Sequence, residues 1–491
     1  MKTDVVVVGA GIGGLSTAAL LTKKGYKVVV LEASNELGGC AGKFDRSGYR
    51  FAAGATLGMG FEEGGVLFRL YQELNLPLPK LINVPIIMDV HMPDGTIRYF
   101  REAENWYKEI ARQFPSDQEN IIAFYEEVFR IGSLLNQLIT QNPTFPPKNL
   151  IHLKQLLPLI SNQSVKLLPY FTQSVADRLK KYQLLSNKRF ITFLNGQLMD
   201  SVQTTIHQSS AIIGYAALQT FHRGAYYVYG GLATIAEDLG QFIQHHGGEI
   251  IKRSKVIGIQ KKADLWHVLT KRKEIFTAKQ LVLNNSIHNL HSLLAEDVKG
   301  KVNIEEDKEK IRQAWGAFSL YVGCRDFLHE KEPLFHQFIE SYDQPLAEGN
   351  HFLFSISVQD DQLMTTKGKR SITISTHTEP SQWWVREHYE TKKQTYSDKI
   401  ISTISSHFPA FQSSIDVLLP GTPVTFKRFV HREDGKVGGY ISTNKYSWLT
   451  SYSSYSGMDG LWLCGDTVFP GAGTLGTVLS GMNVAKQVMQ Q

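Results

Sequence analysis

The sequence predicts an α/β protein in which a parallel β-sheet built from β-α-β units is joined to a second domain of the α+β class. Residues 4–8 read DVVVV and residues 27–31 read KVVVL, and a glycine cluster and a helical pattern separate them. Continuous β-branched runs are typical of strands that are buried on both faces of a parallel sheet. The chain has 491 residues, more than one hydrophobic core usually supports, so two domains are expected.

The glycine cluster directly follows the first predicted strand. In a dinucleotide-binding β-α-β unit, one glycine makes the tight turn, a second lets the backbone approach the pyrophosphate, and a third lets helix and strand pack closely. Gly9, Gly11 and Gly14 match these three roles, and a helix is expected from residue 13 to about residue 24. The whole loop comprises Gly9, Ala10, Gly11, Ile12, Gly13 and Gly14.

Two further features complete this unit. The N-terminus of the predicted helix directs free N–H groups and a partial positive charge at the phosphates. Glu32 ends the second strand, where a carboxylate accepts hydrogen bonds from the adenosine ribose hydroxyls. A glycine-rich turn that binds nothing is the alternative. Both strands, the helix and the acid stand at the right spacing, which favours a Rossmann-type dinucleotide-binding unit.

Residues 32–39 favour FAD over NAD. Glu32 and Ala33 begin a stretch that ends in the pair Gly38-Gly39, followed by Cys40. This stretch resembles the second FAD signature of the glutathione-reductase-like flavoprotein superfamily. The resemblance implies that the glycine pair passes tightly beside the pyrophosphate and ribitol of the cofactor.

The C-terminal region carries a third signature. A short apolar strand over residues 461–464 leads into Gly465-Asp466, and after the stretch 471–476 a final helix is expected to about residue 487. This resembles the "GD" motif of the same superfamily, and the resemblance implies that Asp466 binds the flavin ribitol. The helix N-terminus would face the flavin, where its dipole stabilises the negative charge of the reduced ring. Gly473, Thr474 and Leu475 in the stretch before this helix are candidate cofactor-binding residues.

Residues 471–476 also match the glycine pattern, but only fifteen residues follow them. That is too few for a second dinucleotide-binding unit, so no separate NADPH domain is expected. Reducing equivalents would come from the substrate or through the same cavity. The turn at Gly247-Gly248 and the strand after it resemble the segment of the superfamily in which the backbone near Val256 contacts adenine.

Taken together, these motifs resemble the bacterial phytoene desaturase and carotenoid isomerase family within the amine-oxidase-like flavoproteins. The resemblance extends to Gly54, Ala55 and Thr56, to residues 226–231 and to residues 421–423. It implies a discontinuous FAD domain, a substrate domain and a hydrophobic tunnel that reaches the flavin. The expected FAD domain comprises residues 1–75, 225–290 and 415–491, and the substrate domain comprises residues 76–224 and 291–414.

The chain departs from this family at several positions. Many relatives have Arg after the glycine pair, whereas this chain has Cys40, and Lys43 is a candidate for supplying the missing charge. Ala52, Ala53 and Ala55 stand where relatives often have Asp and Pro. The departures leave the FAD prediction in place and leave the reaction open.

The middle of the chain is expected to be mostly helical between residues 76 and 224. Residues 148–189 carry eight basic residues and one acid among many leucines, which favours a segment that docks on anionic lipid and admits a water-insoluble substrate. The alternative is an ordinary helix with a solvated charged face, and Pro158 and Pro169 interrupt any long amphipathic helix. Residues 316–377 alternate as strands.

The sequence offers fewer candidate residues for the substrate-binding part of the cavity than for the cofactor site. The aromatic groups Trp383-Trp384 and Tyr226-Tyr227-Tyr229 are candidates for the tunnel lining, although aromatic clusters are more often core. His222 and Tyr227 are candidates for substrate-side roles, and no catalytic side chain is assigned. The sixteen histidines show no ligand spacing, so no metal site is predicted.

Composition limits the partners. The net charge of +6 gives no case for nucleic acid as a partner. Cys40, Cys324 and Cys464 are far apart and odd in number, which favours a reducing compartment and argues against disulfides. The uncharged run at residues 5–21 is assigned to the phosphate loop and not to a signal peptide or membrane span. The expected location is the cytoplasm, with a peripheral position on the inner face of the membrane; the oligomeric state is open.

The predicted activity is desaturation of a long lipophilic polyene, a carotenoid precursor, by hydride transfer from an allylic C–H to FAD. Extended conjugation stabilises the developing charge, so the protein supplies mainly geometry and a dry cavity. Three alternatives stay open: a redox-neutral carotenoid cis–trans isomerase, an amine or porphyrinogen oxidase, and a prenyl-lipid carrier of the same fold without flavin. Glu32 and Asp466 argue against the carrier, which needs no ribose or ribitol acceptors.

Overall fold

A five-stranded parallel sheet carries the dinucleotide loop. The computed structural model describes residues 1–147, 150–161, 164–302, 314–439, 441 and 443–491. The two valine-rich runs form adjacent central strands, and each of their residues is buried, as the sequence predicted. In order across the sheet the strands are β19 (Leu461–Leu463), β13 (Gln280–Leu283), β1 (Val5–Val8), β2 (Val28–Leu31) and β9 (Glu249–Ile251).

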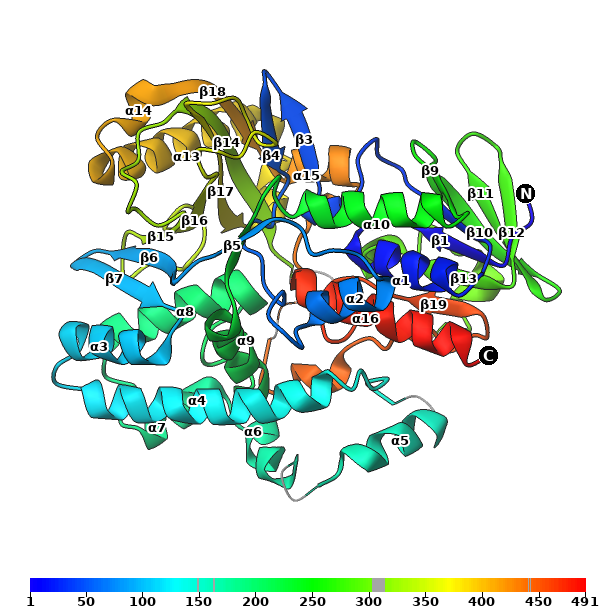
Figure 1. The fold of residues 1–491 in the computed structure, drawn as a ribbon, viewed down its shortest axis with the longest axis horizontal. Helices are drawn as coiled ribbons and strands as arrows, with labels where there is room; N and C mark the ends of the chain where they lie inside the picture. The colour runs from blue at the N-terminus through cyan, green and yellow to red at the C-terminus, as the bar shows by residue number, and fades with distance from the viewer. Residues whose placement is uncertain (148–149, 162–163, 303–313, 440, 442) are drawn as a thin grey trace.

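Different layers cover the two faces of this sheet (Figure 1). One face packs against helices α1 (Ile12–Lys23), α10 (Ala233–His245) and α16 (Gly473–Met489). The other packs against an antiparallel sheet of β10 (Val256–Lys262), β11 (Leu265–Thr270) and β12 (Ile275–Ala278). Helices α1 and α16 cross so closely that a Cβ atom on Gly481 would lie 2.3 Å from the Gly13 carbonyl oxygen. The N-terminal and C-terminal segments therefore form one layer.

A seven-stranded mixed sheet forms the second lobe. All of its neighbouring strands are antiparallel except β15 and β6. Helix α13 (Arg386–His407) packs on one face of it through Ile400 and Ile404. The strand order is β18 (Ile415–Gly421), β14 (Gly316–Arg325), β17 (Lys369–Thr378), β16 (His351–Ile356), β15 (Phe335–Ile339), β6 (Ile86–Met92) and β7 (Gly95–Phe100).

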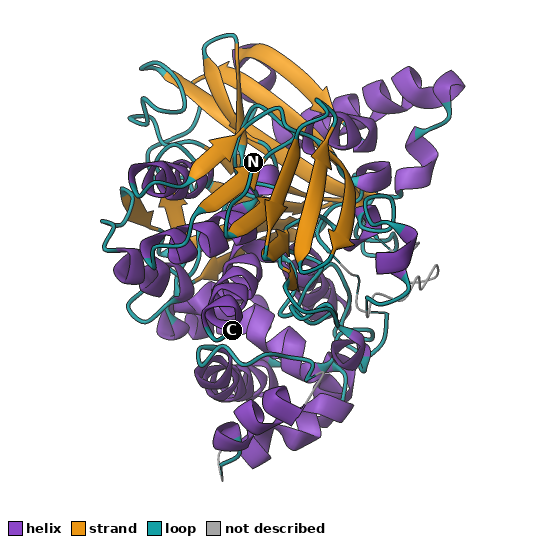
Figure 2. Ribbon diagram, turned by 90° about the vertical axis from the view of Figure 1, so that its right-hand side faces the viewer, coloured by secondary structure: helices purple, strands orange, loops and turns teal. Residues whose placement is uncertain are grey.

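A helical layer continues from this sheet, and Figure 2 shows the helices below the strands. Its core is aromatic and includes Trp106, Tyr125 and Phe193. The helices are α3 (Ala103–Gln113), α4 (Gln118–Ile139), α5 (Leu150–Leu156), α6 (Leu168–Thr172), α7 (Val175–Lys181), α8 (Lys188–Val202) and α9 (Ala211–Arg223). The short elements elsewhere are β3 (Lys43–Arg46), β4 (Tyr49–Ala52), α2 (Val66–Leu74), β5 (Leu81–Asn83), β8 (Tyr226–Val228), α11 (Glu296–Lys299), α14 (Phe411–Ser414) and α15 (Pro423–Val430).

Most of the predicted elements are present. The α/β class with a Rossmann-like unit is confirmed, and residues 316–377 contain strands as expected. Residues 76–224 are mostly helical, as expected, although β6 and β7 come before the first long helix of this segment and extend the seven-stranded sheet. Strand β18, which was expected in the cofactor domain, pairs with β14 in the same sheet. The local pattern of these strands did not reveal their distant partners.

Candidate active site

A cavity of about 1440 Å³ extends between the parallel sheet, the seven-stranded sheet and helices α4, α8 and α9. A pocket for one small ligand usually measures about 300–1000 Å³, so this cavity has room for two. Its cofactor end is formed by the loops that follow β1 and β2 and by the start of α16. Its apolar end is lined by Leu135, Ile139, Leu156, Leu159, Ile212 and Phe221.

The loop after β1 has the geometry that its glycines predict. Gly9 has a φ of +97°, which a side chain would strain. A Cβ atom on Gly11 would lie 2.6 Å from the side-chain nitrogen of Asn284, and one on Gly14 would lie 2.4 Å from the Gly9 carbonyl oxygen. Gly14 therefore permits close packing of helix on strand and does not line the cavity. The backbone at Gly9 and Gly11 faces the cavity.

Glu32 fixes the neighbouring loop. One carboxylate oxygen accepts a hydrogen bond from the Ala10 N–H and the other from the Ser34 N–H, each at 2.7 Å. A carboxylate has about four acceptor sites, so two remain for other donors. Glu32 lines the cavity, so these two sites are open to hydroxyl donors there.

The glycine pair after Glu32 forms a tight turn against the same loop. The Gly38 N–H donates to the Ala10 carbonyl at 2.8 Å, and its φ of +100° requires glycine. The Ala55 N–H donates to the Cys40 carbonyl at 3.1 Å. The Thr56 hydroxyl lies 2.6 Å from the Ser355 hydroxyl, which joins this region to the seven-stranded sheet.

Arg432, which sequence reasoning missed, joins two predicted cofactor residues. It donates to both carboxylate oxygens of Asp466, and the same guanidinium lies 3.6 Å from the Cys40 sulfur. Burial opposes its charge, but the carboxylate of Asp466 holds the pKa of Arg432 above its usual value. One sequence feature pointed to such a residue. Cys40 stands where many relatives have Arg, so a positive charge from another segment could replace the missing one.

Lys43, the residue considered for that charge, has other partners. Its ammonium group lies 2.7 Å from Asp45, 3.8 Å from Glu237 and 3.9 Å from Glu36. Three acids therefore surround the Lys43 ammonium, whereas the guanidinium beside Cys40 comes from Arg432.

The structure brings the other predicted site residues together. Helix α16 starts at the cavity, so its free N–H groups face the space beside Asp466. All the predicted cofactor residues other than Gly14 line the cavity: Gly9, Gly11, Ile12, Gly13, Glu32, Ala33, Gly38, Gly39, Cys40, Gly54, Ala55, Thr56, Val256, Gly465, Asp466, Gly473, Thr474 and Leu475.

The candidates for the substrate side lie elsewhere. His222 is enclosed by the aromatic core of the helical layer and contacts the Arg101 carbonyl at 2.8 Å. The Tyr227 hydroxyl donates to Asp361 at 2.6 Å. Trp383 is core, stacked on Phe318. The tunnel assignment was wrong, since none of Tyr226, Tyr227, Tyr229, Trp383, Trp384 and His222 is among the described residues that line the cavity.

Three comparisons with known proteins agree with this geometry. Residues 7–74 match the model of an NAD(P)-binding Rossmann-like domain. Prolycopene isomerase from Daucus carota is 27% identical over 99% of this chain and 80% of its own length. The human all-trans-retinol 13,14-reductase is 22% identical over 100% of this chain and 86% of its own.

The chain resembles the carotenoid desaturase and isomerase family, as the motifs predicted. Among solved structures, putrescine oxidase bound to putrescine superposes with a TM-score of 0.66 at 14% identity, over 100% of both chains. At that identity the likeness shows the fold, which is the amine-oxidase-like fold expected from the sequence. Among the described residues, no helix combines the length and the apolar character that a bilayer crossing requires.

FAD is the cofactor that this arrangement fits. The close approaches at Gly11 and Gly38 leave no space for side chains beside the cavity, and the carboxylates of Glu32 and Asp466 both line it. Bound FAD supplies an acceptor or donor of hydride. The protein supplies the enclosed apolar space next to it.

Proposed function

We propose that this chain is an FAD-dependent oxidoreductase that desaturates a long lipophilic polyene of the carotenoid-precursor type. One observation carries the proposal: a single cavity extends from the dinucleotide loop to an end lined by leucine, isoleucine and phenylalanine side chains. A hydrocarbon chain offers no polar group for recognition, so an apolar, elongated space beside the cofactor is what such a substrate requires.

Roles at the cofactor end follow from the contacts. Glu32 accepts from the adenosine ribose, and Asp466, held by Arg432, accepts from the ribitol. The N–H groups at the start of α16 face the flavin, where the helix dipole favours negative charge. In this proposal residues 1–75, 225–290 and 422–491 hold the cofactor, because β18 belongs to the other sheet.

The apolar end of the cavity contributes by positioning the polyene and by excluding water from it. Hydride loss from an allylic carbon builds up positive charge that the conjugated chain itself spreads, and loss of a proton from the neighbouring carbon completes the new double bond. The C–H beside such a cation is acidic, so a weak base such as a single water molecule can accept this proton. Side chains of α4 and α9, among them Leu135, Ile212 and Ala216, line this end of the cavity. They exclude water and align the chain, which lowers the barrier chiefly by orientation.

A membrane-facing surface supports the choice of a lipophilic substrate. We define the exposed leucine patch as Leu150, Leu153, Leu157, Ile160, Val165 and Leu168, all of which are exposed large apolar side chains. Leu156 and Leu159 from the same segment line the cavity. One segment thus faces the cavity on one side and solvent on the other, and exposed apolar patches mark sites of membrane or protein contact. We propose that this surface rests on a bilayer and admits the polyene.

Fewer positively charged side chains are free for lipid contact at this surface than the sequence suggested. Arg178 and Lys181 pair with the buried Glu127, Lys188 pairs with Asp343, and Arg189 pairs with Asp94. Among the described residues of the segment, the exposed basic ones that remain are Lys154, Lys166 and Lys180; Lys148 lies outside the described residues. Membrane attachment is therefore expected to depend mainly on apolar burial, with a smaller contribution from anionic lipid.

A redox-neutral cis–trans isomerase is the second candidate, because the Daucus carota relative is named as an isomerase and aligns over 99% of this chain and 80% of its own length. Both reactions would use the same cavity. An amine-type oxidase is less well supported, because Asp200 is the one carboxylate that the described helices α4, α8 and α9 present to the cavity and most of their other lining residues are apolar.

Product analysis separates these candidates. Purified protein with FAD is incubated with liposomes that carry colourless C30 or C40 polyenes, with a quinone as acceptor, and the products are resolved by chromatography. Products with more conjugated double bonds support desaturation. Products of unchanged mass and altered retention support isomerisation. Unchanged polyene in every case, together with peroxide formed from an amine, would contradict both.

A further inference from the structure

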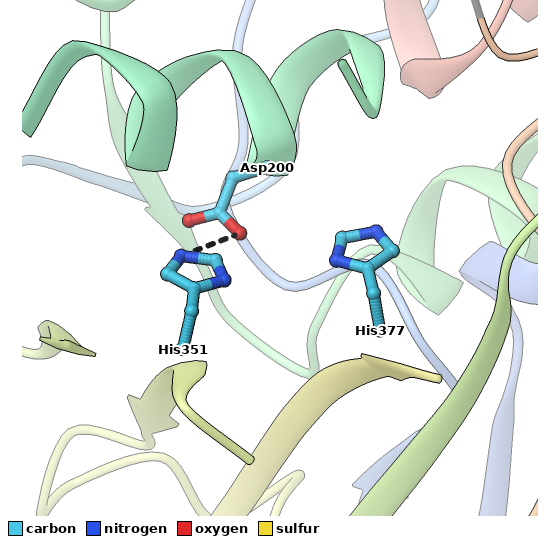
Figure 3. Close-up of side chains that lie close together, drawn as sticks. All are labelled: Asp200, His351 and His377. Atoms are coloured by element: carbon cyan, nitrogen blue, oxygen red, sulfur yellow. Dashed lines mark ion pairs between the residues drawn. The ribbon is translucent and has the colours of Figure 1, made fainter. Parts of the chain in front are cut away.

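Three side chains that the proposed function does not use converge on the wall of the cavity (Figure 3). Asp200 comes from the last turn of α8, His351 from the start of β16, and His377 from the end of β17. One ligand atom of each lies within 4.8 Å of the others. The three residues are far apart in the chain, which is why spacing in the sequence gave no sign of them.

His351 is the member that most needs a partner. Only 1% of its side chain is exposed. Neither of its ring nitrogens has a hydrogen-bond partner among the described residues, and its Nε2 atom lies 3.5 Å from the Asp200 carboxylate. An imidazole buried in this way loses its hydrogen bonds to water without replacement, which is unfavourable. The Nε2 atom of His351 faces the Asp200 carboxylate (Figure 3).

Asp200 is held in place from behind. The side-chain nitrogen of Gln337 donates to one carboxylate oxygen of Asp200 at 2.6 Å, and Gln337 is itself fully buried and accepts from Gln197 at 3.0 Å. The other carboxylate oxygen faces His351. Outer hydrogen bonds of this kind orient the ligands of metal sites in proteins.

We propose that Asp200, His351 and His377 bind one divalent transition-metal ion, of the Zn²⁺ or Fe²⁺ class. Two imidazoles and one carboxylate are the ligand set that these ions share, with bonds of about 2.0–2.2 Å. Small side-chain rotations would bring the three ligand atoms to that distance from a common centre.

The remaining coordination positions would face the cavity. Asp200 and His377 line it, whereas His351 lies behind them. Three protein ligands with open positions are typical of sites that bind an exchangeable ligand and not of closed structural sites. Those positions would take water or an oxygen atom of the molecule in the cavity. The inference does not depend on which polyene reaction the chain performs.

Metal stoichiometry tests the proposal directly. The flavin-loaded protein is treated with a chelator, exposed to Zn²⁺, Co²⁺ or, without oxygen, Fe²⁺, and separated from free metal before elemental analysis. About one metal ion per chain is expected, and Co²⁺ should give visible d–d bands. H377A and D200N should bind none, while H388A, which removes an exposed histidine outside the cluster, should bind as the wild type does.

Flavin absorbance reports whether each variant is folded, so loss of metal with flavin retained is the decisive result. A milder change, Q337L, removes the hydrogen bond to Asp200 and should weaken the metal affinity about 10- to 100-fold. Wild-type protein that binds none of the three ions would overturn the proposal. So would equal binding by the wild type and by H377A and D200N.

Discussion

Arg432 donates to both carboxylate oxygens of Asp466, with the Nη1–Oδ1 distance at 3.1 Å, while its guanidinium contacts the sulfur of Cys40. Two segments that were expected to bind the flavin are thus joined by a residue from a third. Asp466 is fixed in orientation before any ribitol hydroxyl reaches it. A carboxylate held in this way binds with less loss of conformational freedom.

Substitution of Arg432 should weaken FAD binding. Hydrogen bonds to charged groups contribute about 1.5–3 kcal/mol, so R432A should raise the Kd for FAD by roughly 10- to 100-fold, measured by flavin fluorescence titration of the apoprotein. R428A, on the outer part of α15, is the matched control and should bind FAD as the wild type does. Unchanged affinity in R432A would remove Arg432 from the cofactor site.

Substitution of Glu32 should weaken FAD binding as well, because Glu32 both positions the loop after β1 and faces the proposed ribose site. E32A loses the acceptors of the Ala10 and Ser34 N–H groups, and we expect FAD affinity to fall at least tenfold. The exposed Glu249 at the end of the same sheet provides the control E249Q. If calorimetry gave the same Kd for E32A and the wild type, the assignment of the ribose site would be wrong.

Filling the apolar end should block the substrate and spare the cofactor. Ala216 on α9 lines the cavity, and A216W would occupy space that the polyene needs. The expected result is a drop in kcat/KM for a C40 polyene of at least tenfold, with the flavin spectrum unchanged. A410W, on the outer surface at α14, controls for the added indole. Full activity in A216W would show that the polyene lies elsewhere.

The exposed leucine patch should determine attachment to vesicles. Burial of a leucine side chain contributes about 1.5–3 kcal/mol, so L153E and L157E should each lower the partition coefficient on liposomes by about tenfold or more. L363E changes an exposed leucine outside the patch and should have no effect. Sedimentation with vesicles measures the partition. Equal partition of all three variants would exclude this surface.

Two buried histidines should make the protein acid-sensitive. Burial, with smaller effects of His336 and His407, lowers the pKa of His91 to about 3, and burial lowers the pKa of His336 to about 4. Unfolded histidine has a pKa of about 6.5, so below that pH the unfolded state binds more protons than the folded one. The free energy of unfolding should therefore fall as the pH drops from about 6.5 to about 4.

Urea unfolding across that range measures this dependence. Each histidine contributes a slope of up to about 1.4 kcal/mol per pH unit. The variant H336Q, which cannot gain a proton in this range, should show a shallower slope. A free energy of unfolding that stays constant between pH 6.5 and pH 4 would contradict the assignment.

The cofactor end could be predicted from the sequence because its signals are local. The valine runs, the position of Gly9 and the spacing to Glu32 each reflect a requirement of the backbone within one β-α-β unit. The same holds for Gly465 and the start of α16. These features need no knowledge of distant partners.

The rest depends on contacts between segments far apart in the chain. The sequence places Arg178 in a basic segment that favours an exposed charged surface. In the structure it pairs with Glu127, which belongs to another helix. Trp383 was considered for the tunnel, but it packs under α13. The convergence of Asp200 with His377 requires a helix and a strand to meet, and neither carries a motif. Tertiary packing determines the partners of Arg178, Trp383 and Asp200, and no local sequence pattern encodes such packing.

A single turnover without oxygen tests the central claim most directly. Flavin-loaded protein is mixed with one equivalent of a colourless polyene in liposomes, and the flavin and polyene bands are followed together. The account predicts loss of the oxidised flavin band in step with new polyene bands at longer wavelength, one double bond per flavin reduced. Flavin that stays oxidised beside unaltered C30 and C40 polyenes, in protein that binds the liposomes, would contradict it.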